Sequence, residues 1–87
     1  MTIAEALRKE MISRGVGQAW SGDPDLCLSA YALTNGQVKH PLNRIKAVLD
    51  GARRSPLFEQ RGYVLASDAS GNREVQHPLF VLKQTNP

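Results

Sequence analysis

The spacing of the apolar residues changes after Pro56, and this change constrains the fold more than any other feature of the chain. Before Pro56, apolar side chains recur every three or four residues, which is the spacing of one helix face. After it, two short runs, GYVLAS and HPLFVLK, have the composition of β-strands and are separated by the turn-rich segment DASGNREVQ. The chain is therefore predicted to form helices first and a β-hairpin last.

The helical part divides into three segments with recognisable ends. Thr2 and Glu5 have the spacing of a capping box, in which each side chain accepts a hydrogen bond from the other's backbone N–H. Asp23 and Pro24 have the pattern of an N-cap and a first helical position, and Pro41 can begin a further helix. We therefore predict helices at residues 2–14, 24–34 and 41–54.

A chain of 87 residues is long enough for one domain with a single core. The predicted fold is α+β, a single domain of residues 1–87 in which three helices are followed by a C-terminal β-hairpin. Its strands are expected at residues 62–67 and 77–83, with a frayed tail at 84–87. The residues expected to form most of the core are Leu7, Leu26, Leu28, Leu33, Leu42, Ile45, Val48, Leu49, Leu57, Phe58, Val64, Leu65, Leu79, Phe80, Val81 and Leu82.

This order of elements is typical of a small winged helix-turn-helix. Residues 40–66 also resemble the second half of HARE-type winged-helix domains; their sequence is HPLNRIKAVLDGARRSPLFEQRGYVLA. In those domains a third helix ends in a small basic turn, and a Ser-x-Phe-like element then leads to a Gly-aromatic strand. The resemblance implies a winged-helix fold and, because members of that family are thought to bind DNA or chromatin-related partners, a role of that kind. The compact size is similar to that of small regulators carried by phages and plasmids. The matching residues are Leu42, Val48, Leu49, Ser55, Phe58, Gly62 and Tyr63.

The surplus of basic residues lies in the middle of the chain. The net charge is +3, from 11 Lys and Arg against 8 Asp and Glu. Such a local surplus favours a polyanionic partner, although a solvated basic face without a ligand has the same composition. Between residues 38 and 62 the basic residues are Lys39, Arg44, Lys46, Arg53, Arg54 and Arg61, and the acidic ones are Asp50 and Glu59.

The third predicted helix has the composition of a recognition helix on the side away from its apolar stripe. Asn43 and Arg44, near its start, are the first-choice base contacts, because recognition helices read bases with their N-terminal part. Asp50 would repel phosphates unless it pairs with Lys46 or Arg54, which lie four residues away. This face is either a DNA surface or the solvated side of an ordinary core helix.

The loop at residues 67–77 is the expected wing, with Arg73 at or near its tip. We therefore expect a DNA-binding protein, a small transcriptional or replication regulator that places its third helix in the major groove. The alternative is a winged-helix module that docks on another protein, with Trp20, Tyr31 and Phe58 either as exposed anchors or as core residues. The segment that contains Trp20 either provides a core anchor or forms a brief strand over residues 16–20. The predicted DNA-binding residues are Lys39, Asn43, Arg44, Lys46, Arg53, Arg54 and Arg73.

No pattern in the sequence predicts an enzyme, a cofactor or a metal site. His40 is expected to cap the third helix, and both His40 and His77 are expected at the polar surface, without a nucleophile placed beside them by sequence spacing. Cys27 lies between two leucines and is expected to be a buried thiol. With no apolar run long enough for a membrane span and a charged N-terminus, we expect a cytoplasmic protein.

A symmetric pair of chains is the expected oligomeric state, because most helix-turn-helix regulators bind two half-sites. Either the first helix or the edge of the C-terminal strand could supply the contact. The exposed basic residues of that first helix are Arg8, Lys9 and Arg14.

Overall fold

The computed structural model describes residues 1–67, 71 and 73–83. It is a small α+β structure with three helices and a three-stranded antiparallel sheet, so the predicted fold class is confirmed at that level. The predicted frayed tail at 84–87 lies outside the described residues, as do positions 68–70 and 72 of the predicted wing. The elements, in chain order, are α1 (Ile3–Arg14), β1 (Gln18–Ala19), α2 (Pro24–Ala32), α3 (Pro41–Arg54), β2 (Phe58–Ser67) and β3 (Glu74–Leu82).

The helix ends follow the capping chemistry of the sequence. Thr2 Oγ1 accepts from the Glu5 N–H at 3.1 Å, and Glu5 Oε1 accepts from the Thr2 N–H at 3.0 Å, so the capping box is confirmed. Gly15 ends α1 with a φ of 68°, a left-handed conformation that glycine adopts without strain. The second helix ends at Ala32, not at residue 34, because the Thr34 hydroxyl and N–H both bond the Tyr31 carbonyl and close the last turn.

The sheet has the strand order β1-β3-β2. It includes a two-residue strand, β1, inside the segment where a brief strand was expected. The predicted strand starts at Gly62 and His77 are wrong: β2 begins four residues earlier, and β3 begins at Glu74 and ends one residue earlier than expected. A register shift between Gln60 and Tyr63, with Gly62 at a φ of 72°, interrupts the alternation that marks a strand in sequence.

The core lies between the three helices and the part of the sheet nearest to them. Three predicted core residues are exposed instead: Leu33 by 41%, Leu42 by 48% and Leu65 by 62%. Leu33 is the C-cap of α2, Leu42 lies in the first turn of α3, and Leu65 lies in the far part of the hairpin, so each is at the margin of the packed layer. The buried core consists of Ala4, Ala6, Leu7, Met11, Ala19, Leu26, Cys27, Ala30, Tyr31, Ile45, Val48, Ala52, Phe58 and Phe80.

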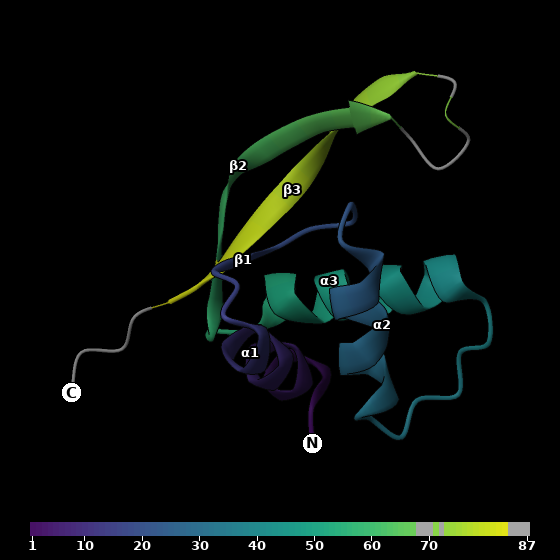
Figure 1. The fold of residues 1–87 in the computed structure, drawn as a ribbon, viewed down its shortest axis with the longest axis vertical. Coiled ribbons are helices and arrows are strands. Elements are labelled where there is room, and N and C mark those ends of the chain that lie inside the picture. The colour runs from purple at the N-terminus through teal and green to yellow at the C-terminus, as the bar shows by residue number, and fades with distance from the viewer. Residues whose placement is uncertain (68–70, 72, 84–87) are drawn as a thin grey trace.

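The helices gather on one side of the molecule, and the hairpin leaves them and arches over α3 (Figure 1). Close packing of α1 on α3 requires Gly51, because a Cβ there would lie 2.8 Å from Ile3 Cγ2. The strand β3 is central, but β1 pairs only with its Phe80 and Val81, so β2 is the long edge strand and the expected contact through the edge of the C-terminal strand stays a prediction. In the described part of the chain, no helix has the length and apolar character needed to cross a membrane.

Candidate functional site

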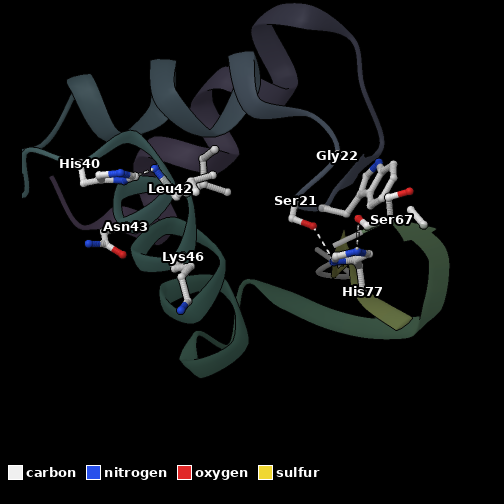
Figure 2. Close-up of a pocket in the computed structure, with 11 residues that line it drawn as sticks. Ser21, Gly22, His40, Leu42, Asn43, Lys46, Ser67 and His77 are labelled. Atoms are coloured by element: carbon white, nitrogen blue, oxygen red, sulfur yellow. Dashed lines mark hydrogen bonds between the residues drawn. The ribbon is translucent and has the colours of Figure 1, made fainter. Parts of the chain in front are cut away.

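A groove of about 690 Å³ separates the N-terminal half of α3 from the far part of the hairpin. In Figure 2, His40, Leu42, Asn43 and Lys46 lie on one side of this groove, and Ser21, Ser67 and His77 on the other. A second hollow of about 590 Å³ shares Asn43 and Lys46 and continues along α3 to Arg53. Both helix residues are exposed, so an amide and an ammonium group are available to a molecule lying in the groove.

One wall of the groove is held together by His77. Its Nε2 lies 3.2 Å from the Ser67 carbonyl oxygen, and its Nδ1 lies 2.9 Å from Ser21 Oγ (Figure 2). Because a carbonyl oxygen only accepts, the proton is assigned to Nε2, and in the neutral ring Nδ1 then accepts from the Ser21 hydroxyl. The imidazole therefore joins the loop before α2 to the end of β2, and it stacks at a tilt beside Trp20 with the ring centroids 5.9 Å apart.

Ser21→Ala is expected to lower the free energy of unfolding by about 1 kcal/mol, because it removes one partly buried hydrogen bond and leaves His77 Nδ1 without its donor. Thermal denaturation followed by circular dichroism measures the effect. Ser13→Ala, on the exposed surface of α1, is the matched control and is not expected to destabilise the protein. Identical unfolding midpoints for Ser21→Ala and the wild type would show that this hydrogen bond contributes nothing.

Asp50 forms ion pairs with two arginines of its own helix. Its Oδ1 lies 2.6 Å from Arg53 Nη2, and its Oδ2 lies 3.1 Å from Arg54 Nη2. The hydrogen bond from Arg53, together with the charges of Arg54 and Arg53, lowers the pKa of Asp50 below its ordinary value. The predicted pairing with Arg54 is therefore confirmed, and the carboxylate that would repel phosphates is compensated. The three groups together carry a charge of +1.

Arg44 lies against α2 and does not line the groove. Its Nε donates to the Val38 carbonyl at 2.6 Å, and its guanidinium carbon lies 5.7 Å from the centroid of the Tyr31 ring. The Tyr31 hydroxyl in turn accepts from the Val38 N–H at 2.9 Å. Arg44 thereby helps to fix the connection between α2 and α3. The base contact predicted for it would need its side chain to point toward DNA, whereas here the side chain is packed against Tyr31 and Val38.

The predicted site residues fall into three groups. Asn43, Lys46 and Arg53 line the two hollows beside α3. Arg54 is paired with Asp50, while Arg44 is packed on α2. Lys39, two residues before α3, and Arg73, directly before β3, are exposed and line neither hollow.

Sequence reasoning did not find the opposite wall of the groove. Ser21 and His77 are 56 residues apart, so no spacing rule connects them, and the sequence did not reveal that the partly buried His77 is bonded through both ring nitrogens. Gly22, next to Ser21, packs against the Trp20 indole, with which a Cβ would collide. His40, in contrast, caps α3 as expected, because its Nδ1 accepts from the Leu42 N–H at 3.2 Å.

For the three aromatic residues and the cysteine singled out in the sequence, the degree of burial decides between a core and a surface role. Tyr31 and Phe58 are core residues, whereas Trp20 is half-buried at the groove. Cys27 is buried as expected, and removal from solvent, reinforced by the charge of Asp23, raises the pKa of its thiol to about 12. Over residues 1–67, 71 and 73–83, no group of three or more His, Cys, Asp or Glu side chains is arranged to hold a metal ion.

Comparison of the chain with protein-family models, with curated proteins and with solved structures finds no match. The function is therefore argued from the residues and the geometry of the groove.

Proposed function

We propose that this chain is a DNA-binding protein with a winged helix-turn-helix arrangement, acting as a small transcriptional or replication regulator of the phage or plasmid type. Three features support the arrangement: a short strand between the first two helices, a hairpin directly after the third helix, and the strand order β1-β3-β2. In this proposal α3 enters the major groove, and the connection between β2 and β3 is the wing.

The groove between α3 and the hairpin is the observation that carries the proposal. It places Asn43 and Lys46 of α3 opposite Ser67 and His77 of the hairpin. The major groove of B-DNA, about 12 Å wide, admits an α-helix. With α3 inserted there, the adjacent phosphate backbone lies along the groove, Lys46 contacts a phosphate, and Asn43 is the residue placed to bond an adenine edge.

The C-terminal end of α3 extends the basic surface. Arg53 lines the second hollow and Arg54 is exposed, and both already have their guanidinium groups gathered around Asp50. A phosphate approaching this end of the helix meets two arginines and one carboxylate. The arginines then provide a second, weaker phosphate contact about two turns away from Lys46.

Lys46→Glu is expected to weaken binding to a random-sequence duplex on the order of tenfold or more, because it replaces a phosphate contact with a repulsive charge. Fluorescence anisotropy at two salt concentrations measures the affinity. Wild-type binding should fall steeply with salt, and the variant should lose about one unit of the log–log salt slope.

Lys9→Glu is the matched control, since it makes the same change in net charge on the exposed surface of α1. It should weaken binding much less than Lys46→Glu. Equal losses of DNA affinity for the two variants would indicate binding through net charge alone and would contradict the assignment of the DNA contact to α3. Absence of binding at low salt by the folded wild type would exclude the DNA-binding proposal.

A protein-binding role is the second candidate, favoured by two apolar side chains that line the same groove, the exposed Leu42 and the half-buried Trp20. A docked protein segment would cover this apolar pair. Affinity for such a partner would change little with salt and would fall with Leu42→Ala, whereas DNA binding would depend mainly on Lys46.

A further inference from the structure

The far half of β2 is an open and uncharged sheet edge. In the described part of the chain, β2 pairs with β3 only, so its other side presents unpaired backbone N–H and C=O groups. Residues 62–67, with the sequence Gly-Tyr-Val-Leu-Ala-Ser, contain no charged residue and no proline, two of the usual protections of an edge strand. The irregularity between Gln60 and Tyr63 is confined to the start of this stretch. Two large side chains in this stretch are exposed, Tyr63 by 59% and Leu65 by 62%.

This stretch is complementary to a second copy of itself. In an antiparallel pair with its two-fold axis at Val64, Tyr63 of each copy lies opposite Leu65 of the other. Residues directly opposite each other project from the same face, so the four side chains form one apolar cluster across the joined strands. Moving the axis by one residue, to Tyr63, would instead place Leu65 opposite the charged Arg61. The register centred on Val64 is the one that places Tyr63 opposite Leu65 at two symmetric contacts.

We propose that two copies of this chain pair through their β2 strands, antiparallel and centred on Val64, so that the two three-stranded sheets become one continuous sheet. The pairing satisfies backbone groups along residues 62–67 and covers Tyr63 and Leu65. It concerns the protein in the absence of any ligand and does not depend on DNA binding.

Sedimentation equilibrium over a range of protein concentrations tests the proposal. The wild type should show a concentration-dependent dimer mass. Leu65→Lys should raise the dimer dissociation constant on the order of tenfold or more, because the two-fold axis makes one substitution act at two cross-strand contacts. Ile12→Lys is the matched control, since Ile12 on α1 is 62% exposed, like Leu65, and it should leave the dimer unchanged.

The register has its own test. Leu65→Glu alone should weaken the dimer, while Leu65→Glu combined with Tyr63→Lys should restore it, because each new lysine then faces a glutamate of the other copy. Circular dichroism confirms that every variant is folded. A monomeric wild type at all concentrations, or a dimer that survives Leu65→Lys, overturns the pairing through β2. A folded double variant that does not regain the dimer overturns the register centred on Val64.

Discussion

Phe80→Ala is expected to lower the free energy of unfolding by about 3–5 kcal/mol. Phe80 is 1% exposed and lies on the central strand, opposite Ala19 of β1 and Gln60 of β2. Its ring fills the core where the sheet meets the helices, so truncation removes buried apolar area and leaves a cavity. Small domains are stable by only about 5–15 kcal/mol in total, and the variant should therefore be close to unfolding. Urea denaturation followed by circular dichroism measures the loss.

Leu33→Ala is the control for this prediction. Leu33 has the hydrophobicity of a core residue and is 41% exposed at the end of α2. Truncation of Leu33 to alanine should lower the free energy of unfolding by less than about 1 kcal/mol. Similar losses for Phe80→Ala and Leu33→Ala would contradict the arrangement of the core described above.

The stability of the protein should fall between pH 9 and pH 12 because of Cys27. The folded thiol has a pKa of about 12, whereas the unfolded thiol titrates near 9. In this window the unfolded chain binds fewer protons than the folded one, so each added pH unit lowers the free energy of unfolding by about 1.4 kcal/mol. Below pH 9 both states hold the proton, and this contribution to the pH dependence disappears.

Cys27→Ala isolates that effect from the titration of tyrosines and lysines. Denaturation midpoints at pH 8 and pH 11 give the stability difference for each protein, and the wild type should lose about 2.7 kcal/mol more than the variant over this interval. Alkylation of the native thiol at pH 8 should also be slow until the protein is unfolded, since the thiolate is the reactive form. Equal pH dependence in the two proteins would show that the Cys27 thiol is accessible in the folded state.

Local chemistry made the helices predictable. The helix ends depend on contacts between residues close in the chain, which can be predicted from the sequence. Examples are the Thr2–Glu5 capping box, Gly15 and the proline at the start of α3. The strand bounds were harder to predict, because the polar residues Glu59 and Gln60 belong to the β2–β3 ladder and the register shift between Gln60 and Tyr63 breaks the alternation of side chains. The exposure of Leu42 and Leu65 could not be inferred either, since it depends on how far the helices extend beneath the hairpin.

The helix wall of the candidate site was partly predictable, and the hairpin wall was not. Asn43 and Lys46 were found because they occupy the polar side of an amphipathic helix. Arg44 was assigned to the same surface by composition, yet its contacts with Val38 and Tyr31 depend on the path of the chain between α2 and α3. The contact of Ser21 with His77 is a tertiary one that no local pattern encodes.

The division of α3 into two faces has a consequence for how such a protein can diversify. Val48 and Ala52 hold the helix in the core and line neither hollow, while Asn43, Lys46 and Arg53 of the same helix line the groove side. A combinatorial library randomised at positions 43, 46, 50, 53 and 54 would therefore sample new ligand preferences on an unchanged scaffold. If α3 binds a ligand as proposed, substitutions at these surface positions would change its specificity while Val48 and Ala52 keep the helix packed.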